Sequence, residues 1–382
     1  MPRVVIIAGE LSGDQLGAGL IDALRQRRPD LEIEGIAGPA MRAAGCKAWL
    51  DCEQLSVMGL FEVLRHLPRL SRLLRETEQR LRDNPPDLLI GIDAPDFNLR
   101  LERQARAAGI RTVQYVCPSV WAWRQGRVKT LRAACDRVLC LLPFEADFLA
   151  EHAVAGEFVG HPLADEIPAG LSAQAARAAL GLDARQVVAL LPGSRAAEVE
   201  RLGPDFARTA AWLAEREPDL VFACPLATPA IGERFRSLLA SYAPGCRVEC
   251  FQGRAREVIA ASDAVLVASG TATLETMLVN RPMVVAYRVA ALTYYLARLL
   301  RLVRVQHVAL PNLLAGRALV PEFLQSAARA EKLGPAMLEM LHSQPLRASL
   351  LGEFEALRGQ LQRDASQRAA EAVLAVAGID PD

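Results

Sequence analysis

The sequence predicts an α/β protein with two Rossmann-like, doubly wound domains and a helical tail. Short β-branched runs alternate with longer amphipathic runs, which is typical of βαβ units in a parallel sheet. The chain has 382 residues, more than one hydrophobic core normally supports, so two domains are expected. Since ligands bind at the carboxyl ends of strands in such sheets, two facing domains would enclose a binding cleft.

Five strands are predicted in the first half, because five short runs are rich in apolar and β-branched residues. They cover residues 4–8, 32–36, 88–92, 112–116 and 137–141. Amphipathic runs predict helices over residues 16–26, 60–82 and 99–108. The stretches Gly160-His-Pro-Leu163 and Pro168-Ala-Gly170 interrupt the alternation and predict a linker between about 160 and 185.

A second set of strand-like runs follows this linker, at residues 187–191, 220–223, 248–251, 264–268 and 283–286. Residues 326–377 have helical composition and no strand pattern. We therefore expect an N-terminal domain over 1–165, a C-terminal domain over 185–325 and a helical tail over 326–382. The tail is expected to pack back on the N-terminal domain of its own chain or of a partner, and the second arrangement would make a homodimer.

Charge and cysteine content exclude several classes of protein. Lys plus Arg and Asp plus Glu are 44 each, which argues against a nucleic-acid binder, because these usually carry a strong basic excess. Eight Cys without a CxxC pair and five scattered His predict neither a disulfide framework nor a metal site, and they favour a reducing compartment. We expect no signal peptide before the first strand and no membrane-spanning helix, since the longest uncharged stretches run about a dozen residues.

Two carboxylates follow the strand at residues 88–92, in the stretch Asp93-Ala-Pro-Asp96-Phe-Asn98. The carboxyl end of a buried strand is where a catalytic base is expected. Asp96 or Asn98 could instead cap the next helix, because Pro95 prevents an earlier start. We expect Asp93 to be the functional acid and Asp96 the helix cap, although the sequence leaves open which of the two is the base.

Two other loops of the first half could contact a ligand. After the first strand, the turn Gly9-Glu10-Leu11-Ser12-Gly13-Asp14 would let backbone amides approach a ligand. The alternative is a tight turn in which Ser12 or Asp14 caps the helix. After residues 112–116, Cys117-Pro-Ser-Val-Trp121-Ala-Trp123-Arg124 suits either a ligand-contacting loop or an aromatic plug.

Two turns of the second half have the composition of phosphate-binding loops. Pro192-Gly193-Ser194-Arg195 places a guanidinium at a helix start, which is unfavourable without an anion and makes Arg195 a candidate for a diphosphate. The alternative is an exposed surface Arg. Ser269-Gly270-Thr271 begins the other turn, and Glu275 lies one helical turn later, where it could accept hydrogen bonds from ribose hydroxyls. The first half has no such acid, so the nucleotide is expected on the second domain.

The stretches 55–82 and 289–305 interleave apolar side chains with Arg, and residues 65–75 and 289–305 contain no acid. This pattern suits a helix lying on an anionic membrane surface. The alternative for either stretch alone is a sheet-covering helix with its Arg side chains in water. Because two such stretches occur, we favour membrane contact. The contacting residues are expected to be Leu60, Phe61, Leu64, Arg65, Leu67, Arg69, Leu70, Arg72 and Leu73.

The motifs along the chain resemble those of the lipid-A-disaccharide synthase family, inverting glycosyltransferases of the two-Rossmann (GT-B) type. The resemblance runs in family order through GELSGDQLGAGL (9–20), AGPAMRAAGC (37–46), VMGLFEVL (57–64), GIDAPDFN (91–98), PSVWAWR (118–124), LPFE (142–145), LPGSRAAEV (191–199), ASGTATLE (268–275), PMVVAYR (282–288) and LPNLLAGR (310–317). Leu11 is bulkier than the family pattern leads us to expect in its loop.

The resemblance implies a reaction without metal or other cofactor. UDP-2,3-diacylglucosamine would donate its sugar, with inversion, to the 6-hydroxyl of 2,3-diacylglucosamine 1-phosphate, giving a β-1′,6-linked disaccharide phosphate and UDP. Asp93 would be the base and Arg195 would stabilise the diphosphate. The implied UDP-sugar residues are Gly193, Ser194, Arg195, Ser269, Gly270, Thr271, Glu275 and Asn312. The implied acceptor or cleft residues are Glu10, Ser12, Gly13, Asp14, Asp96 and Trp123.

The same resemblance implies a cytoplasmic enzyme bound peripherally to the inner face of the bacterial inner membrane, where the acyl chains of its substrates are embedded. Two other functions stay open. The chain could be another UDP-sugar enzyme of this fold, such as a UDP-N-acetylglucosamine 2-epimerase. That function would leave the Leu- and Arg-rich stretch 55–82 unexplained. A non-catalytic sensor of nucleotide sugars or lipids would keep Arg195 and Glu275 but would need no base at Asp93.

Overall fold

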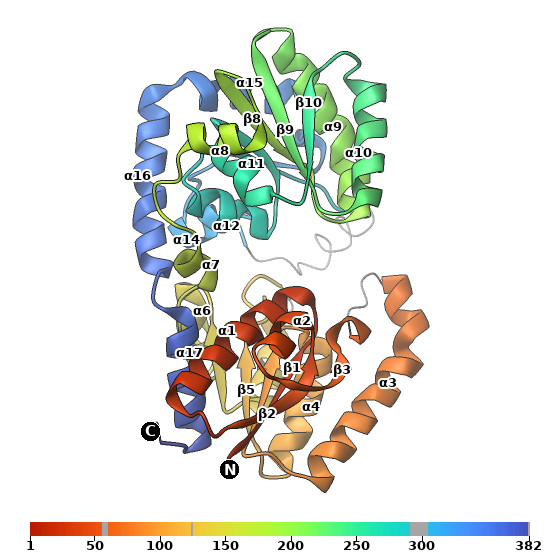
Figure 1. Ribbon diagram of the computed structural model, residues 1–382, viewed down its shortest axis with the longest axis vertical. Coiled ribbons are helices and arrows are strands. Elements are labelled where there is room, and N and C mark those ends of the chain that lie inside the picture. The colour runs from red at the N-terminus through yellow and green to blue at the C-terminus, as the bar shows by residue number, and fades with distance from the viewer. Residues whose placement is uncertain (56–59, 124, 291–304, 381–382) are drawn as a thin grey trace. The chain divides into compact units, whose positions relative to one another are not determined.

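The computed structural model describes residues 1–55, 60–123, 125–290 and 305–380, with the backbone alone for 60–67. The chain forms two α/β units, each built on a parallel sheet, and this confirms the predicted fold class (Figure 1). The first unit contains Met1–Asp165 and Leu361–Asp382, and the second contains Glu166–Gln360.

The first unit has a seven-stranded sheet in the order β3-β2-β1-β4-β5-β6-β7. Its strands are β1 (Arg3–Ala8), β2 (Glu32–Ala37), β3 (Lys47–Asp51), β4 (Leu88–Ile92), β5 (Arg111–Tyr115), β6 (Arg137–Cys140) and β7 (Gly156–Phe158). Its helices are α1 (Leu11–Arg27), α2 (Pro39–Ala43), α3 (Leu60–Asp83), α4 (Pro95–Ala107), α5 (Val128–Ala134), α6 (Pro143–Glu151) and α17 (Ala365–Ala377). The central strands β1 and β4 are apolar and fully buried apart from Arg3 at the start of β1, as expected for strands covered on both faces.

The second unit has a six-stranded sheet in the order β10-β9-β8-β11-β12-β13. Its strands are β8 (Gln186–Leu191), β9 (Leu220–Leu226), β10 (Val248–Gln252), β11 (Ala264–Ala268), β12 (Met283–Tyr287) and β13 (Glu322–Leu324). Its helices are α8 (Ala173–Leu180), α9 (Ala196–Ala214), α10 (Pro229–Tyr242), α11 (Ala255–Ala261), α12 (Thr271–Leu278), α14 (Leu310–Ala315), α15 (Ala330–His342) and α16 (Gln344–Leu361). The short helix α7 (Pro162–Glu166) spans the boundary between the units.

Three strands were not predicted from the sequence, and all three lie at sheet edges. β3 is half-exposed and contains Lys47 and Asp51, while β7 and β13 have three residues each. An edge strand pairs with one neighbouring strand only and is less buried than a central strand. It therefore lacks the apolar run that identifies a central strand in the sequence. The helices α1 and α4 also begin earlier than predicted, at Leu11 and Pro95.

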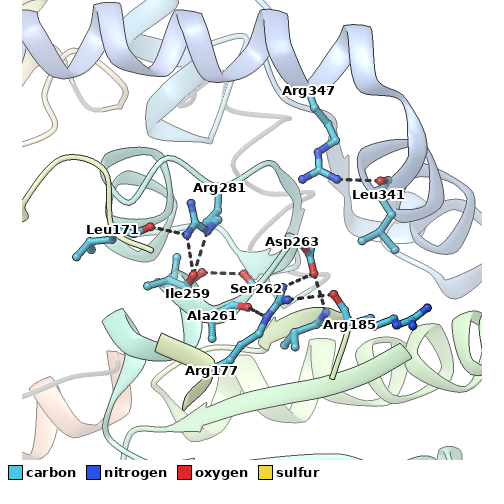
Figure 2. A network of polar contacts seen from close by, with 12 residues as sticks. Leu171, Arg177, Arg185, Ile259, Ala261, Ser262, Asp263, Arg281, Leu341 and Arg347 are labelled. Carbon is cyan, nitrogen blue, oxygen red and sulfur yellow. Dashed lines mark hydrogen bonds and ion pairs between the residues drawn. The ribbon is translucent and has the colours of Figure 1, made fainter. Parts of the chain in front are cut away.

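The predicted linker is not a free connection, because its second half belongs to the second unit. Figure 2 shows Arg177 of α8 donating to the backbone oxygens of Ala261 (2.8 Å) and Arg185 (3.0 Å), and to Asp263 Oδ2 (2.6 Å). Arg281 donates to the backbone oxygen of Leu171 at 2.8 Å. Burial lowers the pKa of the Arg281 guanidinium from its ordinary value. These bonds fasten residues 166–185 to the second sheet, so the boundary falls at 165 and not across the whole interval.

The Asp263→Ala substitution should destabilise the second unit by roughly 1–3 kcal/mol. Asp263 Oδ2 also accepts from the Val187 amide at 2.8 Å, so its removal leaves that amide without its acceptor and the largely buried Arg177 guanidinium without its carboxylate partner. Urea denaturation followed by hydrogen exchange of second-unit peptides measures the change. Asp219→Ala, at an exposed carboxylate of the same unit, is the control, and an equal effect of both substitutions would contradict the structural role of Asp263.

The tail divides between the two units, which corrects the expectation that all of residues 326–382 pack on the N-terminal domain. The helices α15 and α16 belong to the second unit, where the buried Arg358 donates to the backbone oxygens of Leu278 (2.7 Å) and Ile167. Only α17 joins the first unit, where it packs along α1 (Figure 1). Asp165 accepts hydrogen bonds from three amides at its start, including that of Ala365 at 2.7 Å. A homodimer through the tail stays a prediction.

Candidate active site

The strand order of each sheet reverses once, between β1 and β4 in the first unit and between β8 and β11 in the second. In such sheets, ligands bind outside the carboxyl ends of the two strands that flank the reversal. Ala8 pairs with Ile92, and Leu191 pairs with Val267, so the segments after these strands emerge side by side. The fold therefore brings residues 9–14 next to 93–96 in one unit, and 192–195 next to 269–275 in the other.

Asp93 directly follows β4 and has an unusual backbone conformation. The φ angles of Asp93 and Ala94 are 54° and 41°, in the left-handed region that costs non-glycine residues roughly 1–3 kcal/mol each. A Cβ atom on Gly9 would lie 2.1 Å from the Ala94 Cβ, so the glycine after β1 makes room for this turn. The turn holds the half-buried Asp93 at the point where the strand order reverses.

Two fully buried side-chain amides hold the Asp93 backbone in this conformation. Asn98 Nδ2 donates to the Asp93 carbonyl oxygen at 2.8 Å, and Gln114 Nε2 donates to the same oxygen at 3.3 Å. The Asp93 amide donates to the Tyr115 carbonyl at 3.1 Å. The strained turn is thus fixed by α4 and β5 together, which fixes the direction in which the Asp93 side chain leaves the backbone.

Burial raises the pKa of the Asp93 carboxyl above its ordinary value, and a hydrogen bond from the Ala94 backbone offsets only part of this effect. A carboxylate with a raised pKa is a stronger base than a free aspartate. Asp93 therefore has the position and the chemistry of a general base.

In the second unit, backbone amides of the loop after β8 donate to a carboxylate in the first turn of the following helix, α9. Gly193 has a φ of 124°, and a Cβ atom there would lie 2.6 Å from the Glu198 Cβ. The Glu198 carboxylate accepts from the amides of Ser194 (3.2 Å) and Arg195 (3.4 Å). The anion expected at this helix start is thus Glu198, and the two amides are not available to a ligand. The Arg195 side chain is 58% exposed, with a 3.3 Å contact to Glu198, and such exposed pairs are weak.

The loop after β11 leaves its amides open. Gly270 has a φ of 151° and precedes α12, and within residues 125–290 and 305–380 the amides of Thr271 and Ala272 meet no protein acceptor. Ser269 differs from expectation, because its hydroxyl donates to the Val308 carbonyl at 2.8 Å and its amide donates to the Ala286 carbonyl at 2.9 Å. Open amides at a helix start attract phosphate oxygens.

Glu275 lies one turn further along α12 and is half-buried. Burial raises the pKa of its carboxyl, while the Arg256 charge lowers it and the Glu166 charge raises it. In the part of the chain that the structure describes, its carboxylate accepts no hydrogen bond from another side chain. The arrangement suits a diphosphate at the helix start with a hydroxyl-bearing group beside Glu275.

Comparison with known proteins identifies the family. The lipid-A-disaccharide synthetase family matches residues 4–376 of the chain. Lipid-A-disaccharide synthase of Alkalilimnicola ehrlichii is 54% identical, with 98% of this chain and 99% of the relative covered. The enzyme of the same name from Azotobacter vinelandii is 52% identical, with 98% of each chain covered. The chain belongs to the lipid-A-disaccharide synthase family.

Members of the lipid-A-disaccharide synthase family are glycosyltransferases of lipid A biosynthesis, so the predicted enzyme class is confirmed. Solved structures of the same fold include UDP-GlcNAc 2-epimerase from Neisseria meningitidis bound to UDP-GlcNAc, with a TM-score of 0.67, 12% identity and coverage of 98% of this chain and 100% of that one. The glycotransferase of kitacinnamycin has a TM-score of 0.63 at 16% identity, with 98% of each chain covered. At such identities these structures show the fold alone.

Asp14 belongs to a family motif, but its carboxylate is buried and binds backbone amides of the first unit. Its side chain is 1% exposed, and its carboxylate accepts from the amides of Gly38 (2.8 Å), Ala40 (2.8 Å) and Met41 (3.0 Å). It therefore caps α2, and its assignment to the acceptor site is wrong. In the same loop, Ser12 is exposed and Gly13 is buried.

The expected helix caps of the two acceptor loops also differ from the structure. The helix α1 begins after Glu10 and is not capped by Ser12 or Asp14. Asp96 is not a cap either, because α4 begins after Ala94, with Pro95 in its first position. Asp96 is 86% exposed and forms a 2.6 Å ion pair with Arg127.

Asn312 is likewise a structural residue. It is fully buried, donates to the Val320 carbonyl (2.9 Å) and to Glu322 (2.8 Å), and accepts from the amides of Leu319 and Val320 (2.7 Å each). All its hydrogen-bonding capacity is used inside the protein. The assignment of Asn312 to the UDP-sugar site is therefore wrong, and its role is to shape the segment around α14.

The two tryptophans of the PSVWAWR motif have different environments. Trp121 Nε1 donates to Glu145 at 3.1 Å and its ring stands edge-on to Phe144, so it is the aromatic plug. Trp123 is 42% exposed and is the residue of the pair that can meet a ligand. Glu145 also lies near the buried thiols of Cys117 and Cys140, a grouping with metal-ligand chemistry. Its oxygens already accept from Trp121 and from the amides of Leu141 and Leu142.

The described part of α3 corrects one predicted membrane residue. Leu73 is 6% exposed and belongs to the core of the first unit, with Leu70 partly buried against that core. Arg69 and Arg72 are exposed. The side chains of Leu60, Phe61, Leu64, Arg65 and Leu67 lie outside the described residues, as does most of the second stretch. In the described ranges, no helix has the length and apolar character to cross a membrane.

Proposed function

We propose that this glycosyltransferase joins UDP-2,3-diacylglucosamine to 2,3-diacylglucosamine 1-phosphate, releasing UDP and a β-1′,6-linked disaccharide phosphate. Family membership supplies the reaction class. The observation that carries the proposal is the half-buried Asp93 carboxylate, with its raised pKa, at the end of β4 where the strand order of the first sheet reverses. A sensor of nucleotide sugars would have no use for a base held in this way.

In the proposed mechanism, Asp93 accepts the proton of the acceptor 6-hydroxyl as its oxygen attacks the anomeric carbon of the donor. Attack occurs on the face opposite UDP, so the bond to the diphosphate breaks with inversion of configuration. The bonding electrons leave on the β-phosphate oxygen of UDP. A base of raised pKa at a fixed position lowers the barrier to this proton transfer. Asn98 and Gln114 support the step, because they fix the Asp93 backbone.

The second unit carries the donor in this proposal. The open amides of Thr271 and Ala272 at the start of α12 donate hydrogen bonds to the phosphate oxygens, and the exposed Arg195 guanidinium neutralises the charge that develops on the leaving diphosphate. Glu275 accepts hydrogen bonds from the ribose hydroxyls. Arg195 exchanges its weak contact with Glu198 for a phosphate, while Glu198 keeps the amides of the loop.

The test is UDP release measured with each acylated sugar alone and with both together. The proposal expects release only when donor and acceptor are both present, with a lipid disaccharide found by mass spectrometry. A 2-epimerase would convert the UDP-sugar without any acceptor, and a sensor would bind it without turnover. Either of these results would contradict the proposal.

We also propose that the enzyme lies peripherally on the inner face of the bacterial inner membrane. The start of α3 and the stretch 289–305 supply Leu and Arg side chains in the combination that anionic lipid surfaces attract. The exposed Arg69 and Arg72 are consistent with such a surface. Contact would bring the protein to the acyl chains of both substrates.

The triple substitution Leu60→Ser, Leu64→Ser and Leu67→Ser should lower binding to phosphatidylglycerol vesicles at least tenfold. Each Leu that enters the acyl region contributes roughly 1.5–3 kcal/mol, and Ser does not. Vesicle co-sedimentation measures the effect, and an unchanged melting temperature shows that the fold is retained. Tyr242→Ser, at an exposed apolar residue of the second unit, is the control. Unchanged vesicle binding by the triple variant would show that α3 is an ordinary sheet-covering helix.

A further inference from the structure

A groove of about 440 Å³ lies on the first unit between the beginnings of α4 and α5. Asp96, Leu99, Arg100 and Arg103 line it from α4, where spacings of three and four residues place side chains on one face. Arg127 and Thr130 line it from the other side. The groove therefore has three guanidinium groups and one carboxylate.

The charges of this groove are not balanced within the protein. Arg127 pairs with Asp96 at 2.6 Å, but that carboxylate is 86% exposed and such a pair is weak. Arg100 and Arg103 are exposed, and neither has a carboxylate partner in the described part of the chain. Like charges three residues apart on one helix face repel each other by a few tenths of a kcal/mol. An anion in the groove would relieve this repulsion.

The groove begins beside the proposed base. Pro95 and Asp96 line it, and Asp93 precedes them in the same strand-to-helix turn. Because neighbouring Cα atoms are 3.8 Å apart, the Cα atoms of Asp93 and Asp96 are at most about 11 Å apart. An acceptor whose reacting hydroxyl meets Asp93 therefore has the rest of its sugar ring near the opening of the groove.

We propose that this groove binds the phosphate monoester of the acceptor, with Arg127, Arg100 and Arg103 as its cationic side chains. The inference rests on the proposed function, since it takes the acceptor to be a sugar phosphate. A phosphate monoester carries about −1.5 to −2 charges near neutral pH, and the planar fork of Arg suits its oxygens. One sugar ring separates the reacting 6-hydroxyl from the 1-phosphate, so binding the phosphate here orients the hydroxyl at Asp93.

The experiment compares 2,3-diacylglucosamine 1-phosphate with 2,3-diacylglucosamine as acceptors for the full chain. Arg127→Gln and the double variant Arg100→Gln/Arg103→Gln should each raise the KM for the phosphorylated acceptor about 10-fold to 100-fold. The KM for the UDP-sugar should change less than twofold. With the acceptor that lacks the phosphate, wild type and variants should have equal kcat/KM.

Arg132→Gln is the matched control, because it removes an exposed guanidinium of α5 that does not line the groove. Equal losses with both acceptors would overturn the inference, and so would unchanged KM values in every variant. A loss of binding to phosphatidylglycerol vesicles without discrimination between the acceptors would assign the groove to lipid headgroups, which also overturns it. Thermal melts of each variant show whether it is folded.

Calorimetric binding of the two acceptors separates this inference from the proposed function. If the wild type binds the phosphorylated acceptor at least tenfold more tightly than the other, and Arg127→Gln abolishes that difference, the groove binds phosphate even if no disaccharide forms. If disaccharide forms but the binding difference is absent or survives in Arg127→Gln, the function stands and the phosphate site is wrong.

Discussion

The Asp93→Asn variant should turn over about 10²-fold to 10⁴-fold more slowly than the wild type, with UDP binding unchanged. An amide occupies the volume of the carboxylate but cannot accept the proton of the attacking hydroxyl, and a general base contributes a factor of this size. The hydrogen bonds with Asn98, Gln114 and Tyr115 engage the Asp93 backbone, which the substitution leaves unchanged, so the variant keeps the strained conformation. Steady-state kinetics and UDP calorimetry measure the two quantities.

The pH dependence follows from the direction of the pKa shift. The base acts in its ionised form, and burial raises the pKa of Asp93, so kcat/KM should fall tenfold per pH unit below a midpoint higher than that of a free aspartate. The residual rate of Asp93→Asn should lack this acidic limb. Asp96→Asn tests the alternative base and should keep the acidic limb, while Asp147→Asn, at an exposed carboxylate of α6, is the matched control. Near-normal turnover in Asp93→Asn, with loss in Asp96→Asn, would transfer the role of base to Asp96.

The Arg195→Ala variant should lose about 10²-fold to 10³-fold in kcat/KM and should bind UDP more weakly. Removing one charged group that stabilises the developing diphosphate costs this much in comparable sites. Glu198 accepts from the loop amides independently of the Arg195 side chain, so the loop and the start of α9 should be retained. Arg195→Lys keeps the charge without the planar fork and should recover part of the rate.

Arg216→Ala is the matched control for Arg195, because it removes an exposed guanidinium just beyond the other end of α9. Its kinetic constants should equal those of the wild type. If Arg195→Ala also matches the wild type in UDP affinity and turnover, Arg195 is an ordinary surface residue. The diphosphate charge would then be met by the amides of α12 and other groups.

The alternation of strands and helices was sufficient to predict both sheets, because the central strands are buried on both faces and read as apolar runs. The edge strands β3, β7 and β13 could not be predicted in this way, since they are short or half-exposed. The linker was misplaced because the hydrogen bonds of Arg177 and Arg281 tie residues 166–185 to distant backbone carbonyls. Such long-range contacts leave no local pattern.

The sequence predicted where the candidate site residues lie in the fold better than it predicted what each side chain does. Asp93 and Arg195 lie at strand ends beside a reversal of strand order, as their place in the sequence indicated. Asp14 and Asn312 lie in similar motifs but are buried and fully hydrogen-bonded, and a motif does not distinguish a ligand contact from a residue that shapes the loop. Gln114 was missed because β5 contains several polar residues, and nothing in its sequence distinguishes the buried amide that supports Asp93 from the others.

The residues of the proposed phosphate groove had no local signal. Arg100 and Arg103 look like ordinary solvent-facing residues of an amphipathic helix in a sequence with many Arg. They form a cationic groove only together with Arg127, which is distant in the sequence and is brought next to α4 by the fold. The overall charge of the sequence is balanced, so it does not reveal this local excess of positive charge.

The proposed reaction forms a β-1′,6 bond between two acylated glucosamines. The most direct test is NMR analysis of the lipid product made from UDP-2,3-diacylglucosamine and 2,3-diacylglucosamine 1-phosphate by the purified chain. We predict a large anomeric proton coupling, typical of a β-glucosaminide, and a carbon–proton correlation from that position to carbon 6 of the acceptor. An α-linked product, a linkage to another hydroxyl, or conversion of the UDP-sugar without an acceptor would contradict the account.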